Sequence, residues 1–117
     1  MYTVVSFNGL HNRTKAKVLI FLLYLSENGA RQGITINQLA NLTGLPISSL
    51  RTLLPKWWRW GYVNMIKLGK AKPDGSTCLY RIGLKGRNYV QLTIPTTVYN
   101  ECIQDIQDWQ REAGLLK

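Results

Sequence analysis

The sequence of 117 residues has few of the residue types from which catalytic and metal sites are built. It holds one histidine, His11, two cysteines, Cys78 and Cys102, and six acidic residues. The histidine and the isolated cysteines do not match the spacing of zinc ligands, and they suggest no nucleophile with a paired base. Glycines at the spacing of a dinucleotide-binding or phosphate-binding loop are also absent. We therefore expect no metal, no cofactor and no enzymatic activity.

Long apolar runs are missing as well. The longest, residues 18–25, has eight residues, whereas a membrane-spanning helix needs roughly 20. The first residues lack the basic segment, apolar stretch and small-residue cleavage site of a secretory signal. These absences predict an intracellular, cytoplasmic protein without a membrane partner. In that compartment the two cysteines are expected as thiols rather than as a disulfide.

Negative charge is scarce over most of the chain. Residues 1–90 carry thirteen lysines and arginines against two acidic residues, an excess of eleven, whereas residues 91–117 carry two against four. Such an excess repels itself unless a polyanion lies nearby, and the phosphate backbone of nucleic acid is the most direct candidate. The alternatives are a role in solubility or attraction to an acidic membrane. Membrane-surface proteins, however, usually carry one basic amphipathic helix, which this chain lacks.

What the chain does contain is a pair of short amphipathic helices within residues 35–63. Thr35 can cap the first helix through its hydroxyl, and Gln38 can reach back to the Thr35 amide. Gly44 accepts the left-handed conformation that ends this helix and begins the turn. Pro46 suits the first turn of the second helix, whose apolar face is formed by Leu50, Leu53, Leu54 and Trp57.

A longer helix is expected before this pair, from Asn12 or Thr14, either of which can cap it, to Ser26. Its apolar residues cover nearly all sides, which is typical of a central core helix. Its first turns are basic, and these side chains can either bind phosphate or remain solvated. The possible phosphate contacts in this helix and at the start of the next are Arg13, Lys15, Lys17 and Asn37.

The periodicity changes after the second helix of the pair. Residues 62–70 and 77–84 are rich in β-branched and aromatic residues, which predicts two strands. The Pro-Asp-Gly sequence at residues 73–75 is a strong turn signal, so the two strands are expected to form a β-hairpin. A short strand stub is expected at Ile34.

Together these residues resemble the winged helix-turn-helix family of bacterial, archaeal and viral transcription regulators, with a MarR-like order of elements. The resemblance covers residues 14–90 and rests on Thr43-Gly44-Leu45, the leucines that follow, Gly61-Tyr62-Val63 and the basic hairpin. It implies an α+β fold, mainly α, with a three-helix core and a β-hairpin wing. It also implies that the second helix of the motif enters the major groove, that the wing lies along the minor groove or backbone, and that the protein is a dimer.

Two features depart from the family pattern. Pro55 lies inside the second helix of the motif, where a proline removes one backbone hydrogen bond at a cost of about 3 kcal/mol. We expect a kinked but continuous helix, the alternative being a helix that ends at Leu54. Tryptophans also stand where the family usually has charged residues. Of these, Trp58 and Trp60 are expected to pack beneath an arm or a second subunit rather than to stack on bases.

On a helical wheel, the polar side chains of this helix lie on the face opposite Leu50, and we expect this face to contact DNA. Arg51 is the best candidate for a bidentate contact with guanine, whereas the hydroxyl side chains can bind either bases or phosphates. The predicted contacts on this helix are Ser48, Ser49, Arg51, Thr52, Lys56 and Arg59, of which Lys56 and Arg59 are placed for the backbone. The predicted contacts on the wing are Lys67, Lys70 and Lys72.

A last helix is expected from Thr96 or Thr97 to about Ala113. Its apolar residues form one stripe, which can either fold back on the same chain or pair with a second copy across a two-fold axis. The length and acidity of the helix, together with the family habit, favour the dimer. The predicted dimer residues are Val98, Cys102, Ile106, Trp109, Ala113 and Leu116.

These observations predict an N-terminal arm (1–11), a DNA-binding domain (12–91) and a dimerisation element (92–117). The expected function is sequence-specific binding of double-stranded DNA by a homodimeric transcription regulator, located at the nucleoid of its own cell or of the host of a virus or plasmid. No small-molecule effector is evident. The alternatives are a winged-helix protein-interaction module of a transcription or replication assembly, and a non-specific, chromatin-type DNA binder.

Overall fold

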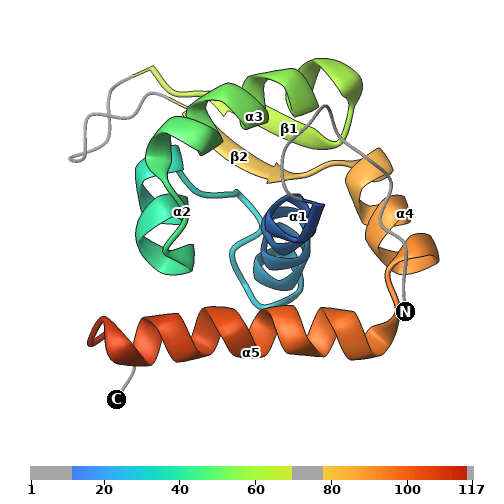
Figure 1. Ribbon diagram of the computed structural model, residues 1–117. Coiled ribbons are helices and arrows are strands. Elements are labelled where there is room, and N and C mark those ends of the chain that lie inside the picture. Colours follow the sequence, from blue (N-terminus) through green and yellow to red (C-terminus); the bar gives the residue numbers. More distant parts are fainter. Residues whose placement is uncertain (1–11, 70–77, 116–117) are drawn as a thin grey trace.

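Five α-helices and one small antiparallel sheet form the structure (Figure 1), a computed structural model that describes residues 12–69 and 78–115, with side chains from residue 14 onward. The elements are α1 (Asn12–Glu27), α2 (Ile36–Thr43), α3 (Ile47–Trp60), β1 (Val63–Lys67), β2 (Cys78–Ile82), α4 (Leu84–Thr93) and α5 (Thr96–Glu112). This confirms the predicted α+β class, mainly α. The predicted arm and the candidate residues Lys70, Lys72 and Leu116 lie outside the described residues.

Helix α1 is the central helix of the fold, as its apolar sequence predicts (Figure 1). It contacts α4, α5 and β2, so neighbouring elements cover it on several sides. Burial runs without a break from Val18 to Leu23, which explains why nearly every face of this helix is apolar. Within the described residues, no helix combines the length and apolar character that crossing a membrane requires.

Helix α2 begins and ends as its sequence predicts. The Thr35 hydroxyl accepts a hydrogen bond from the Gln38 amide at 3.1 Å, and the Thr35 amide donates to the Gln38 side chain at 3.0 Å. Gly44 ends the helix with φ 73°. A Cβ at this glycine would lie 2.6 Å from the Trp109 ring, so the turn needs glycine both for its conformation and for its packing.

Helix α3 continues through Pro55 to Trp60 and ends at Gly61, where φ is 84°. The continuous helix is therefore confirmed, and the alternative end at Leu54 is wrong. The four apolar residues that define its inner face, Leu50, Leu53, Leu54 and Trp57, are all buried. The buried face thus keeps its register across the proline, because Trp57 lies on the same side as the leucines that precede it.

The two strands pair antiparallel in a register that runs from Val63 opposite Ile82 to Lys67 opposite Cys78. Both strands are shorter than predicted, and the Pro-Asp-Gly turn at residues 73–75 lies outside the described residues. Ile34 forms an isolated bridge with Tyr80, which confirms the expected strand stub. The short sheet therefore joins the segment before α2 to the hairpin that follows α3.

Helix α4 was not predicted from the sequence. The second strand, expected to reach Leu84, ends at Ile82, and the chain turns directly into this helix. A glycine inside a short helix obscures the helical pattern, yet Gly86 is required here, because a Cβ would collide with the Tyr62 carbonyl oxygen. Leu92 is an apolar residue of α4 that is 84% exposed, so the positions of the apolar residues do not indicate which face of this helix is buried.

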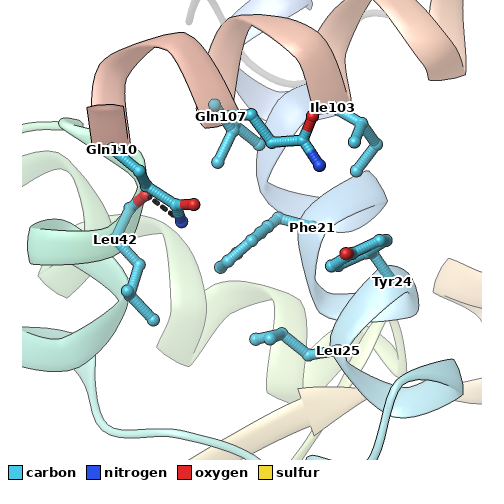
Figure 2. A pocket seen from close by; sticks show the side chains of 8 residues that line it. Phe21, Tyr24, Leu25, Leu42, Ile103, Gln107 and Gln110 are labelled. Carbon is cyan, nitrogen blue, oxygen red and sulfur yellow. Dashed lines mark hydrogen bonds between the residues drawn. The ribbon is translucent and has the colours of Figure 1, made fainter. Parts of the chain in front are cut away.

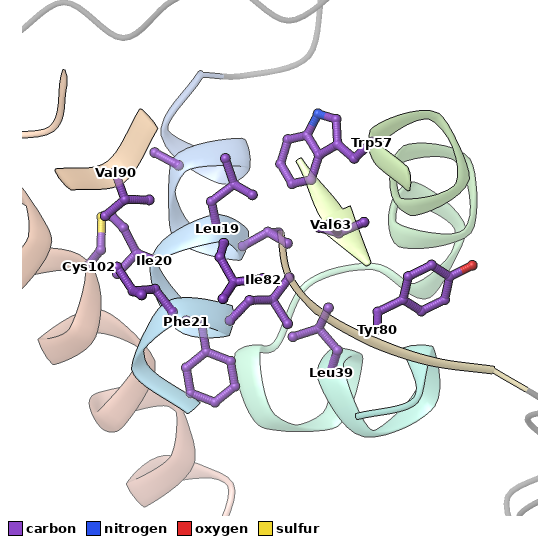
Figure 3. Close-up of a cluster of buried hydrophobic side chains, with 14 of the residues drawn as sticks. Leu19, Ile20, Phe21, Leu39, Trp57, Val63, Tyr80, Ile82, Val90 and Cys102 are labelled. Atoms are coloured by element: carbon purple, nitrogen blue, oxygen red, sulfur yellow. The ribbon is translucent and has the colours of Figure 1, made fainter. Parts of the chain in front are cut away.

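Helix α5 has the predicted bounds, but its apolar stripe faces the same chain. Val98, Cys102 and Ile106 are buried in the core cluster shared with α1, in which Figure 3 draws Cys102 together with Ile20. The structure therefore corrects the assignment of these three residues to a dimer contact, because their side chains are already covered. Ala113 is exposed, and the existence of a homodimer remains a prediction.

The end of α5 also packs against the end of α2. The Trp109 Nε1–H donates to the Asn41 carbonyl at 3.1 Å, and the Gln110 side-chain amide donates to the Leu42 carbonyl at 2.9 Å. The second of these bonds is drawn in Figure 2, at the edge of an apolar pocket of about 240 Å³ between α1, α2 and α5. Contacts of α5 with both α1 and α2 hold it against the rest of the fold.

Candidate nucleic-acid interface

The outer face of α3 carries the predicted polar residues. Ser48, Arg51, Thr52 and Arg59 are exposed, whereas Ser49 and Lys56 are half-buried at its edges. The placement follows from the helical period, because the opposite face is occupied by the four buried apolar residues. All six predicted residues of α3 therefore lie on one side of the helix, and its opposite side is buried in the core.

Two details define what this face can bind. The Thr52 hydroxyl donates to the Ser48 carbonyl at 3.2 Å, so its oxygen remains able to accept a further hydrogen bond. Within the described residues, no carboxylate oxygen lies within 4.0 Å of the Arg51 guanidinium. Arg51 thus presents its planar set of donors to solvent, an arrangement that suits the O6 and N7 acceptors of guanine or a phosphate.

The predicted phosphate contacts of α1 are not part of this face. Lys15 is only 1% exposed, and its pKa is lowered by burial and by the neighbouring Lys56. Lys17 forms an ion pair of 3.9 Å with Asp105 of α5. Lys15 therefore cannot contact phosphate in this structure. The charge of Lys17 is already paired with a carboxylate of α5. Asn37 is half-buried, and the Arg13 side chain lies outside the described side chains.

Burial of Lys15 gives a pH-dependent prediction. Because its pKa is lowered in the folded chain, folding disfavours the charged form, and this cost is fully present near neutral pH. The cost disappears as the pH rises from the lowered pKa to the unfolded value of about 10.5. We expect Lys15→Met to raise the free energy of unfolding near neutral pH, because the variant buries an apolar side chain where the wild type buries a charged one.

The measurement is urea unfolding of both proteins from neutral pH to above about pH 10, where the advantage of the variant should shrink. Comparing the two proteins at each pH cancels the titration of the tyrosines. A variant that is less stable at neutral pH, or an advantage that does not change with pH, would contradict this prediction.

The C-terminal end of α3 carries two features that the sequence interpretation left out of the site. Trp58 is 46% exposed and Trp60 is 41% exposed, on either side of the exposed Arg59. The predicted covering of these two indoles by the arm or by a second subunit remains a prediction, because the arm lies outside the described residues.

On the hairpin, Lys67 is exposed at the end of β1, whereas Lys70 and Lys72 lie outside the described residues.

The described ranges contain no group of three or more His, Cys, Asp or Glu residues that could hold a metal ion. One acidic residue of α5, Asp108, accepts hydrogen bonds from Gln104 and Arg111 on its own helix.

Comparison of the chain with protein-family models, curated proteins and solved structures gives no match. The assignment of a function therefore depends on the geometry and the charge of the described residues.

Proposed function

We propose that the protein binds double-stranded DNA in a sequence-specific manner, as a winged helix-turn-helix transcription regulator that places α3 in the major groove. The observation that carries this proposal is the exposed Arg51, flanked by hydroxyl side chains, on the outer face of a helix with a fully buried inner face. A guanidinium held in this way can read guanine, and the hydroxyls can bind bases or phosphates.

The order of elements supports the same proposal. A capped α2, a glycine turn and α3 are followed at once by an antiparallel hairpin with the exposed Lys67, which corresponds to the wing. The bridge between Ile34 and Tyr80 ties this hairpin to the segment before α2. In this arrangement the wing would lie on the minor groove or the backbone beside the half-site read by α3.

A homodimer remains part of the proposal, with half-sites about one helical turn apart. Its contact would use surfaces other than Val98, Cys102 and Ile106, which the chain buries itself. Trp109 and Ala113 at the end of α5 are exposed and stay available for such a contact.

The proposal is tested by selecting binding sites from random duplex fragments and then measuring affinity for a selected site against salt concentration. The logarithm of the affinity should fall linearly with the logarithm of salt, with a slope of about 0.9 per phosphate contacted. Affinity that does not respond to salt, or selection that enriches no sequence, would contradict sequence-specific binding.

A second candidate function is supported by the half-exposed Trp58 and Trp60. Tryptophans are enriched in the energetically dominant parts of protein interfaces, so the same fold could dock a protein partner in a transcription or replication assembly. This function predicts no binding of duplex DNA at near-physiological salt. It also predicts that Trp58→Ala weakens capture of the partner without affecting the fold.

A further inference from the structure

A polar pocket lies at the base of the hairpin, and no residue of α3 lines it. Its volume is about 510 Å³, within the usual range of small-molecule sites. Three arginines, Arg31, Arg81 and Arg87, line it together with a single carboxylate, Glu27. Residues from the end of α1, the turn after it, both strands and α4 meet here, although these segments are far apart in the sequence.

The three arginines extend from backbone that the fold fixes. Arg87 of α4 is half-buried, and its Nη2 donates to the Ser26 hydroxyl at 3.3 Å. Arg81 of β2 is paired with Asn64 in the strand register. Arg31 belongs to a turn closed by hydrogen bonds from Ala30 to Leu25 and from Gly33 to Ala30. Little backbone entropy would therefore be lost when a ligand binds between them.

The charge of this pocket is not balanced by the residues that the structure describes. Among the described residues, no carboxylate oxygen lies within 4.0 Å of any of the three guanidiniums. Three guanidiniums against one glutamate leave an excess of two positive charges, and a phosphate monoester carries about two negative charges near neutral pH. Guanidinium groups also match phosphate oxygens in bidentate geometry.

A purely structural role explains only part of this cluster. Cations near the end of a helix stabilise its dipole, and Arg87 does so for α1 through its bond to Ser26. Arg31 and Arg81 are exposed, and among the described residues neither forms an ion pair within 4.0 Å with Glu27 at the end of α1. We propose that the pocket formed by Arg31, Arg81 and Arg87 is a binding site for a phosphate group, separate from the outer face of α3.

The test uses the full chain with inorganic phosphate as the probe and chloride at matched ionic strength as the reference. The Nε–Hε signals of the arginine side chains are followed by NMR, and phosphate should shift those of the three pocket arginines saturably. Arg81→Gln should weaken phosphate binding about tenfold, whereas the matched control Arg111→Gln, at an exposed arginine of α5 outside the pocket and outside the face of α3, should leave it unchanged. Equal shifts with phosphate and chloride, or equal weakening by both substitutions, would overturn the proposal.

The phosphate can belong to a free ligand or to the backbone of nucleic acid, and two further titrations distinguish these sources. If Arg81→Gln weakens binding of duplex DNA, the pocket receives a backbone phosphate. If it weakens binding of a nucleoside monophosphate alone, the pocket receives a free ligand. An Arg81→Gln protein that binds all three phosphate carriers as the wild type does would refute the site.

Discussion

Replacement of Arg51 by alanine is expected to weaken binding to a selected DNA site by about 1 to 3 kcal/mol and to relax the preference at one base pair. Arg51 is exposed on the outer face of α3, away from the buried residues, so the substitution removes the guanidinium without disturbing the core. Affinities are measured at one fixed salt concentration, for the selected site and for sites in which each base pair is changed in turn.

Arg59→Ala is the matched control, because it removes the same charge from the same helix about two turns further along. We expect it to weaken all sites alike and to leave the preference among them intact, as for a contact with the backbone. If Arg51→Ala behaved in the same uniform way, the protein would be a non-specific DNA binder. If neither substitution changed the affinity, α3 would not be the DNA-binding element.

Replacement of Trp57 by alanine is expected to lower the free energy of unfolding by about 3 to 5 kcal/mol. Its side chain is completely buried, and its ring centroid lies 6.3 Å from that of Tyr62 at the start of the hairpin. A small domain is usually stable by only about 5 to 15 kcal/mol, so this one change should bring the protein close to unfolding. Urea denaturation followed by circular dichroism provides the measurement.

Trp58→Ala is the control for this second prediction. The neighbouring indole is 46% exposed, and a substitution outside the core usually changes stability by no more than about 0.5 kcal/mol. Similar losses for the two variants would show that Trp57 is not the residue that α3 buries after Pro55. The register of the helix beyond the proline would then differ from the one described here.

Local chemistry explains which parts of this fold are predictable from the sequence. The reciprocal bonds of Thr35 and Gln38, the left-handed Gly44 and the buried face of α3 each depend on residues a few positions apart. Such patterns can be recognised in a sequence because the interacting groups are held together by the helix itself. The same holds for the outer face of α3, which is fixed once the inner face is known.

The features that were missed depend on contacts between distant segments. Gly86 lowers the helical tendency of α4, and only its packing against the Tyr62 carbonyl explains its presence. The apolar stripe of α5 is equally suited to a partner or to its own chain, and the core around α1 decides the choice. Lys15 is charged and near the start of a helix, so its sequence position does not indicate that it is buried.

The hydrogen bonds from α5 to Asn41 and Leu42 have a consequence for how the fold is completed. These carbonyls belong to the last turn of α2, which an isolated helix would leave without partners, and the donors, Trp109 and Gln110, come 68 residues later in the chain. A helix of eight residues is too short to persist alone in water. The first helix of the proposed DNA-binding motif is therefore completed only when α5 has docked, and a ribosome-bound chain still lacking α5 would hold α2 incompletely ordered.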